Sequence, residues 1–219
     1  MRRETLDQNI AGLQAMLGEL ADGVAAAFRG ATAALLDHRL RMAERVIEGD
    51  PALDELCLRI EALATETITI FAPVGADMRT LVSAIQSAHE LERMGDLAKH
   101  VAEAMQRRDP APVVPVLAKP LLTEFSGAAI AMVAKAATVL RTRNVLLAME
   151  LDADDDRVDD LHRQLFALMF GDEWTAGIPA AVDLTLLARF YERIADHAVA
   201  LAERTVYEVT GRHPEALQL

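Results

Sequence analysis

The sequence predicts an all-α protein made of two tandem three-helix bundles that are related by an internal repeat. Hydrophobic residues make up 52% of the chain but aromatic residues only 4%, so the apolar content is mainly Ala, Leu, Val, Ile and Met, several of which are strong helix formers. A Glu-Arg-x-x-Asp motif at 92–96 returns at 192–196, and six of the twelve positions over 92–103 are identical to those over 192–203. Such repetition predicts one supersecondary unit used twice.

The first helix has one apolar face. Its members recur at intervals of three or four residues: Leu6, Ile10, Leu13, Leu17 and Leu20. The same spacing continues through Val24 and Phe28 to Ala31, so the helix is expected to reach at least that far. A further helical segment is predicted over 37–48, after a bend near Asp37.

Proline and glycine set the bounds of the next two helices. Asp50 followed by Pro51 is typical of an N-cap and a first helical position, so the second helix is expected to begin there. It runs to about Phe71, where the Ala-Pro-Val-Gly stretch at 72–75 breaks it. The third helix carries the first acidic motif and is expected to be capped by Asp77.

A proline-rich stretch separates the two halves. The third helix is expected to end near Arg108, because three prolines within 110–115 cannot continue a helix. The sequence therefore predicts a first three-helix repeat over 1–108, a proline-rich linker over 109–117 and a second three-helix repeat over 118–219.

The second half repeats the plan of the first. Helices are expected over about 120–143 and 155–170, and a loop at 171–179 leads to a last helix that ends near Gly211. Short loops join antiparallel neighbours, so each half is expected to be a three-helix bundle.

The overall charge and composition exclude several functions. A net charge of −12 argues against nucleic acid as a partner and favours cations or basic protein surfaces. The single cysteine, Cys57, suits a reducing cytoplasm. No signal peptide is expected, and Lys135 stops the apolar run at 127–134 well short of the roughly 20 residues that span a bilayer. No Gly-rich phosphate loop and no nucleophile–base pair is visible, so the chain is not expected to be an enzyme.

Paired carboxylates are the candidate functional residues. Residues four apart share a helix face, and the chain has such pairs at matched places in both halves. They are Asp50/Asp54, Glu92/Asp96, Asp155/Asp159 and Glu192/Asp196. The register of the third pair stays open, because several aspartates crowd together there and only the alignment of the two repeats selects one pair: Asp152, Asp154, Asp155, Asp156, Asp159 and Asp160. If the second and third helices of each half pack antiparallel, four carboxylates converge, and they repel one another unless a cation lies between them or some stay protonated.

Two interpretations of these carboxylates remain open. They can form a solvated or salt-bridged face, with Lys99 and Arg189 as nearby partners and Asp50 as a helix cap. Alternatively they bind a hard cation, for which oxygen ligands suit Mg²⁺, Ca²⁺, Mn²⁺ or iron. The Glu-x-x-His motif of di-iron bundles is absent, which argues against a redox enzyme.

The two motifs resemble the paired signatures of the PhoU family. The stretch 90–96, Glu-Leu-Glu-Arg-Met-Gly-Asp, is similar to the family's acidic-Leu-Glu-Arg-Ile-Gly-Asp signature, and 191–198, Tyr-Glu-Arg-Ile-Ala-Asp-His-Ala, is similar to its second copy. The stretches 46–50 and 206–211 and the two-repeat, six-helix plan fit the same family. Phe190 stands where the signature has an acidic residue, which predicts a second site with fewer ligands.

This resemblance implies an accessory regulator of phosphate homeostasis. PhoU-like proteins are cytoplasmic and usually homodimeric, and they negatively regulate phosphate uptake and the phosphate-starvation two-component system. They act through the sensor histidine kinase and the ATPase of the phosphate ABC transporter, and reach the membrane only through such partners. Their acidic motifs carry divalent or trivalent metal ions, a role that transfers to Asp50, Asp54, Glu92, Asp96, Asp155, Asp159, Glu192 and Asp196.

Two other functions stay open from the sequence. One is a multinuclear metal-carboxylate enzyme or a metal-storage helical bundle. The other is a structural helical adaptor that binds no metal.

Overall fold

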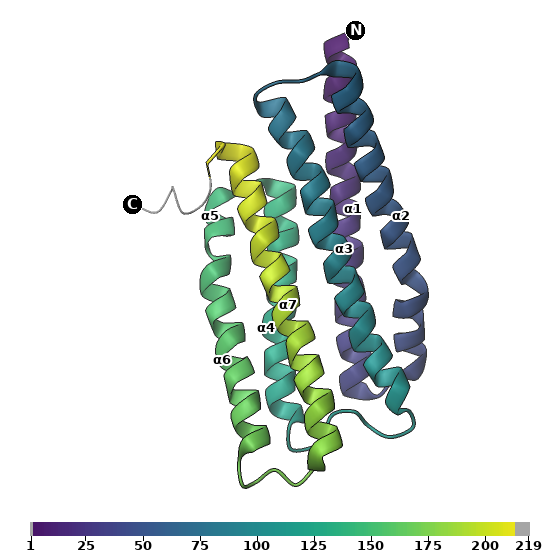
Figure 1. The fold of residues 1–219 in the computed structure, drawn as a ribbon, viewed down its shortest axis with the longest axis vertical. Coiled ribbons are helices and arrows are strands. Elements are labelled where there is room, and N and C mark those ends of the chain that lie inside the picture. Colours follow the sequence, from purple (N-terminus) through teal and green to yellow (C-terminus); the bar gives the residue numbers. More distant parts are fainter. Residues whose placement is uncertain (1, 213–219) are drawn as a thin grey trace.

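A computed structural model describes residues 2–212, and residue 1 and residues 213–219, the outer ends of the two expected repeats, lie outside the described part (Figure 1). Within residues 2–212 the secondary structure is helical and contains no strand. The helices are α1 (Arg2–Asp37), α2 (Leu40–Phe71), α3 (Ala76–Arg108), α4 (Lys119–Thr142), α5 (Val145–Met149), α6 (Leu151–Phe170) and α7 (Gly177–Thr210). The all-α class predicted from the sequence is confirmed.

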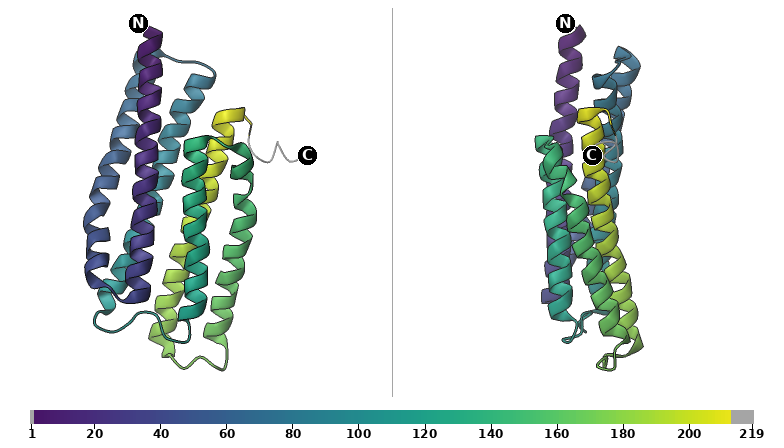
Figure 2. Two further views of the ribbon diagram at one scale, coloured as in Figure 1. Left: turned by 180° about the vertical axis from the view of Figure 1, so that it is seen from behind. Right: turned by 90° about the vertical axis from the view of Figure 1, so that its left-hand side faces the viewer.

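The long helices form two sets of three that lie side by side (Figures 1 and 2). α1, α2 and α3 pack together in one set, and α4, α6 and α7 in the other. The sets meet where α3 packs against α7 and α1 packs against α4. Each motif-bearing helix, α3 or α7, therefore belongs both to its own bundle and to the joint between the bundles.

An aromatic centre fills this joint. Tyr191 of α7 is fully buried, with its ring centroid 5.3 Å from that of Phe28 in α1 and 5.7 Å from that of Phe125 in α4. Its hydroxyl shares a 3.0 Å hydrogen bond with that of Thr32, which is also buried. A large side chain with one polar atom is stable in a core when that atom is hydrogen-bonded, so Tyr191 links three helices from both sets.

The second helix begins earlier than its proline suggests. The prediction that Asp50 caps this helix is wrong, because α2 begins at Leu40 and contains Pro51 in its interior. The apolar face of α2 continues across this point through Ala43, Cys57 and Ile60, which are all buried. Packing of that face against α1 and α3 outweighs the local cost of an interior proline, and it leaves Asp50 buried in mid-helix.

Other helix ends differ from prediction by a few residues. Gly75, with φ of 64°, stands at the N-cap of α3, and Asp77 lies in its first turn. The chain inserts the short helix α5, whose N-cap Asn144 accepts a hydrogen bond from the Leu147 N–H at 3.2 Å. α6 then begins at Leu151 rather than near residue 155. The predicted stop at Gly211 is confirmed, with φ of 71° in the left-handed region.

α4 is long and apolar enough to cross a membrane by length and composition, in contrast to the prediction from the run at 127–134. Half of its most apolar window is buried inside the molecule. Phe125, Met132 and Val133 are among its buried residues, while Lys135 forms ion pairs at its surface. These features are those of a core helix.

Candidate metal centres

The first carboxylate cluster consists of Asp50 and Asp54 from α2 and Glu92 and Asp96 from α3. Asp50 is only 3% exposed, and the other three side chains are half-buried. Burial raises the pKa of Asp54, and the charges of Asp50 and Asp96 raise it further. Burial also raises the pKa of Glu92. The charge of Arg93 lowers this pKa, whereas the charges of Asp96 and Asp54 raise it further. The packing of α2 on α3 therefore brings all four carboxylates into one electrostatic group, as the i, i+4 pattern predicts.

Two cations of the protein already serve this first cluster. The Lys99 ammonium donates a hydrogen bond to Asp50 Oδ2 at 2.5 Å, and this bond is the main reason that the pKa of Lys99 is raised. The Arg93 guanidinium lies 3.5 Å from Glu92 and 3.4 Å from Asp96. The buried aspartate is thus neutralised by a lysine from the same helix that carries the motif.

The second carboxylate cluster consists of Asp155 and Asp159 from α6 and Glu192 and Asp196 from α7. Asp155 and Glu192 are half-buried, whereas Asp159 and Asp196 are exposed. Burial, followed by the charges of Asp159 and Asp196, raises the pKa of Asp155 to about 6. The two helices therefore bring this second set together as well, in the register given by the repeat alignment.

Protein cations serve the second cluster less completely. The Arg189 guanidinium lies 2.5 Å from Glu192. Between residues 2 and 212, no lysine or arginine forms an ion pair with the carboxylate of Asp155 or Asp159. Lys135 of α4 instead pairs with Asp154 at 2.6 Å and with Glu150 at 3.0 Å. The carboxylates of α6 in this cluster thus lack a cationic partner.

The clusters fit a hard metal ion by the chemistry of their donors. All eight side chains offer carboxylate oxygens, the ligands that Mg²⁺, Ca²⁺ and Mn²⁺ take. In the described part of the chain, however, no three carboxylate, imidazole or thiol side chains form a ready-made ligand set for one ion. The backbone places the donors of each cluster on neighbouring helices, α2 and α3 in the first and α6 and α7 in the second.

An ion-pair group between the bundles was not predicted from the sequence. Glu90 of α3 accepts hydrogen bonds from His197 Nδ1 at 2.7 Å and from Arg204 Nη2 at 2.6 Å, both on α7. The pKa of Glu90 is lowered, mainly by the hydrogen bond with His197. Burial acts in the opposite direction, and Arg204 lowers this pKa further. Residues two apart on a helix point in nearly opposite directions, so Glu90 faces the joint while Glu92 faces the cluster.

The contacts of Glu90 show that Phe190 does not reduce the number of carboxylates in the second cluster. The counterpart of Phe190, Glu90, belongs to the joint and not to the first cluster, so an aromatic residue at 190 removes no carboxylate from the second cluster. Phe190 packs against the His100 ring instead, with 5.4 Å between centroids. The prediction of fewer ligands at the second site rested on a side chain that faces elsewhere.

Cys57 lies beside the first cluster but is not a reactive thiol. It is buried, and burial together with the nearby charge of Glu92 raises the pKa of its thiol to about 11. A buried thiol with so high a pKa carries almost no thiolate at neutral pH and is therefore a poor nucleophile.

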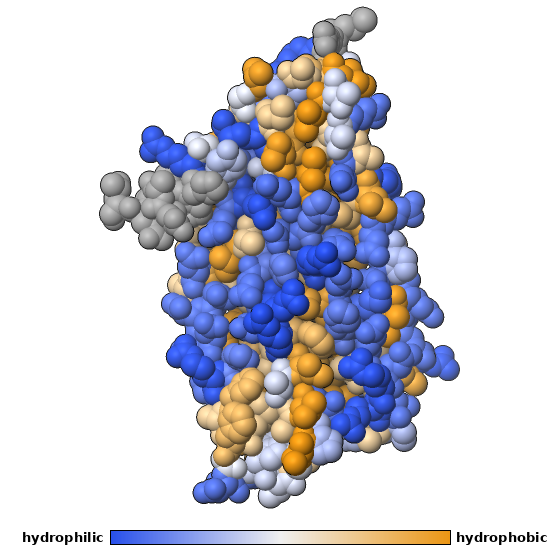
Figure 3. All heavy atoms as spheres, in the orientation of Figure 1, coloured by the Kyte–Doolittle hydropathy of each residue, from blue (hydrophilic) through white to orange (hydrophobic). Residues whose placement is uncertain are grey.

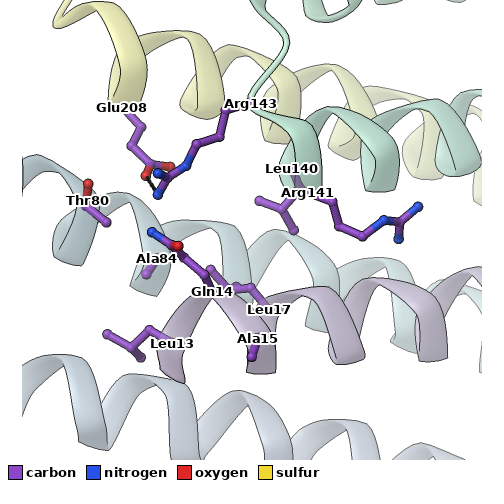
Figure 4. A pocket seen from close by; sticks show the side chains of 10 residues that line it. All are labelled: Leu13, Gln14, Ala15, Leu17, Thr80, Ala84, Leu140, Arg141, Arg143 and Glu208. Carbon is purple, nitrogen blue, oxygen red and sulfur yellow. Dashed lines mark hydrogen bonds and ion pairs between the residues drawn. The ribbon is translucent and has the colours of Figure 1, made fainter. Parts of the chain in front are cut away.

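A cavity of about 240 Å³ between the bundles is a competing candidate site (Figure 4). In Figure 4 the side chains of Arg143 and Glu208 point toward each other, and they are 2.5 Å apart. Arg141 points away from this pair and bonds Asp22 at 2.5 Å. Both arginines are thus already neutralised, so the cavity has less unpaired charge to offer a ligand than the second cluster has.

We expect Asp155→Asn to stabilise the metal-free protein at pH 7. The pKa of Asp155 is about 6 in the folded protein, above the ordinary value of 3.8. Between these two pH values the native state therefore binds the carboxyl proton of Asp155 more tightly than the unfolded state does. Stability contributed by this group therefore falls as pH rises from about 4 to about 6. After discounting for solvent screening, Asn should add about 1 kcal/mol at pH 7 and almost nothing at pH 4.

Urea denaturation in the presence of a chelator measures this difference. Asp172→Asn, at an exposed position after α6, removes the same charge outside the cluster and should change the free energy of unfolding little. Equal effects of the two substitutions, or a loss of stability in Asp155→Asn at pH 7, would contradict the assigned crowding of charge.

Comparison with known proteins connects this geometry to a family. The model of the PhoU domain matches the chain twice, over residues 17–105 and 122–205. The chain is 38% identical over 212 residues to "Phosphate-specific transport system accessory protein PhoU homolog 2" of Mycobacterium tuberculosis, covering 97% of this chain and 100% of that protein. It is also 38% identical over 213 residues to PhoU homolog 1 of Mycobacterium leprae, covering 97% and 96% of the two chains.

Solved structures share the fold. A phosphate transport system regulatory protein PhoU from Streptococcus pneumoniae matches with a TM-score of 0.84 and 23% identity, over 95% of this chain and 98% of the other. PhoU from Pseudomonas aeruginosa matches with a TM-score of 0.82 and 23% identity, over 94% and 99%. The two tandem three-helix bundles are therefore an arrangement seen in other proteins.

Proposed function

Because this chain belongs to the PhoU family, we propose that it is an accessory protein of phosphate transport that represses phosphate uptake and the phosphate-starvation response. The observation that carries the proposal is the identity of 38% across 97% of the chain to a protein named as an accessory protein of the phosphate-specific transport system. The role is regulatory and non-catalytic. The protein would act in the cytoplasm as a homodimer.

Protein contacts transmit this regulation. The proposed partners are the sensor histidine kinase of the phosphate two-component system and the ATPase of the phosphate ABC transporter. Apolar side chains on one face of the molecule gather toward its ends, away from a hydrophilic middle (Figure 3). At the end of the second bundle, α6 and α7 expose Phe170, Ile178 and Val182. Exposed apolar surface of this kind is typical of protein contact sites.

Metal ions on the two clusters would order the carboxylate faces. The support is the all-oxygen donor set and its duplication in both bundles. The pKa of Asp155 is raised first by burial and then by the charges of Asp159 and Asp196, so this carboxylate lies among like charges. A bound divalent or trivalent cation (Mg²⁺, Ca²⁺, Mn²⁺ or iron) would remove that repulsion.

Alkaline phosphatase activity in a strain that lacks this gene tests the regulatory role. We expect high activity in abundant phosphate, returned to a low level by the intact gene. Equally low activity in the deletion strain and in the parent would contradict repression of the phosphate-starvation response.

Charge-neutral variants test the metal role. We expect the combined substitutions Glu92→Gln, Asp96→Asn, Glu192→Gln and Asp196→Asn to remove bound metal, measured by elemental analysis of the purified protein. The control is Glu44→Gln with Glu48→Gln, a carboxylate pair with the same spacing on α2 outside both clusters.

Three results would change the metal assignment. Unchanged metal content in the fourfold variant would contradict the assigned sites. Equal thermal stability with and without chelator would favour a metal-free adaptor, since a ligand that binds the native state stabilises it. Oxidase activity of iron-loaded protein would favour the metal-carboxylate enzyme instead.

A further inference from the structure

One position of the repeat differs in charge between the two bundles. The 100-residue offset that aligns Glu92 with Glu192 also aligns Lys99 with Val199. Each residue lies on the motif-bearing helix of its bundle, seven positions after Glu92 in the first repeat and after Glu192 in the second. The first cluster therefore has a lysine where the second has an apolar side chain.

Lys99 occupies the place of a cation in the first cluster. Its ammonium bonds the carboxylate of Asp50 at 2.5 Å, and its charge also interacts with those of Asp54 and Asp96. Asp50 is the most buried carboxylate of the cluster, at 3% exposure. Breaking an ion pair that involves a buried charge is costly unless a new cation replaces the old one.

The second cluster has no corresponding internal cation. Its only ion pair with a lysine or arginine in the described part of the chain joins Arg189 to Glu192, and the Arg189 side chain is 57% exposed. Val199 offers no charge, and Lys135 is held by Asp154. A cation from solution would meet free carboxylate oxygens here and would displace no protein group from Asp155 or Asp159.

We propose that Lys99 is a built-in counter-ion that competes with metal ions for the first cluster, so that the second cluster is the tighter metal site. A metal ion at the first cluster must either expel the ammonium from Asp50 or bind beside a like charge. The inference rests on the metal role proposed above. It adds that the two duplicated sites respond to different metal concentrations.

Titration of the chelator-treated protein with Mn²⁺ tests the proposal, with free Mn²⁺ counted by electron paramagnetic resonance. We expect two classes of site in the unaltered protein. Glu192→Gln with Asp196→Asn should remove the tighter class, and Glu92→Gln with Asp96→Asn should remove the weaker one.

Exchanging the two side chains separates the effect of the lysine from that of the carboxylates. Lys99→Val should raise the affinity of the first cluster for Mn²⁺ at least tenfold. Val199→Lys should lower the affinity of the second cluster by a similar factor. Val199 is only partly buried, so this second variant tests the proposal even if Lys99→Val does not fold, and circular dichroism checks the folding of both.

Each remaining outcome overturns a definite claim. Unchanged affinities in both exchange variants would overturn the role of Lys99 while leaving the metal role in place. A tighter first cluster in the unaltered protein would do the same. Absence of Mn²⁺ binding from all variants, including Lys99→Val, would overturn the metal role together with this inference.

Discussion

Tyr191→Ala is expected to lower the free energy of unfolding by about 4 kcal/mol. The substitution deletes a fully buried aromatic ring that contacts Phe28 and Phe125 and so leaves a cavity where the two bundles meet. Aromatic-to-alanine changes in cores cost about 3–5 kcal/mol, through lost transfer free energy and the cavity that remains. The Thr32 hydroxyl would also lose its partner inside the core. Guanidinium denaturation followed by circular dichroism measures the loss.

A smaller change at the same site separates the ring from its hydroxyl. Tyr191→Phe keeps the ring and should cost about 1–2 kcal/mol, because the buried Thr32 hydroxyl is left unpaired. Adding Thr32→Val should recover part of that cost, since both partners are then apolar. A Tyr191→Ala protein as stable as Tyr191→Phe would show that the ring packing does not support the joint.

Glu90→Gln is expected to cost about 2 kcal/mol at neutral pH. Glu90 is 14% exposed and accepts bonds from His197 and Arg204 across the joint. Removing the charge leaves the Arg204 guanidinium without its anion, and pairs of this degree of burial are worth more than exposed ones.

The pH dependence of this loss follows from the lowered pKa of Glu90. The native state holds this proton less tightly than the unfolded state does, so the stabilisation is fully present above the unfolded pKa of about 4.3. It is lost as pH falls through the folded-state pKa. The difference between the parent protein and Glu90→Gln should therefore shrink in acid below that value.

Glu124→Gln provides the matched control. Glu124 pairs with Arg157 on the surface, where both side chains are about half exposed, and such pairs contribute about 0–1 kcal/mol. Urea denaturation of both variants at pH 7 compares the two glutamates directly. A larger loss for Glu124→Gln than for Glu90→Gln would contradict the importance given to the joint.

The fold could be predicted because local and long-range patterns agree. Apolar periodicity gives the helices, and the repeated motif shows that one three-helix unit occurs twice. The start of α2 could not be predicted, because Asp50-Pro51 has the composition of a helix start and only the packing of its neighbours shows otherwise. The short helix α5 was missed for a similar reason, since its few residues carry too little periodic signal.

The candidate site was predictable in part. Spacing of four residues places two carboxylates on one face, so each pair follows from the sequence alone. Which neighbouring helix a side chain contacts depends on how the bundles pack. The sequence therefore did not show that Glu90 contacts α7 rather than the first carboxylate cluster. Lys99 was expected as a partner of the carboxylates because it lies three residues after Asp96, but its pairing with Asp50, 49 positions away, depends on the contact of α2 with α3.

The pairing of α3 with α7 and of α1 with α4 joins each helix to its own counterpart in the other repeat. In Figure 1 the partners of each pair run in opposite directions, as equivalent elements can do around a two-fold axis. Each repeat can therefore serve as the reference for the other. The effect of a substitution in one repeat can be compared with the effect of the same substitution at the equivalent position of the other repeat, under identical solution conditions. Effects common to both repeats then belong to the shared three-helix unit, and effects found in one repeat belong to that repeat alone.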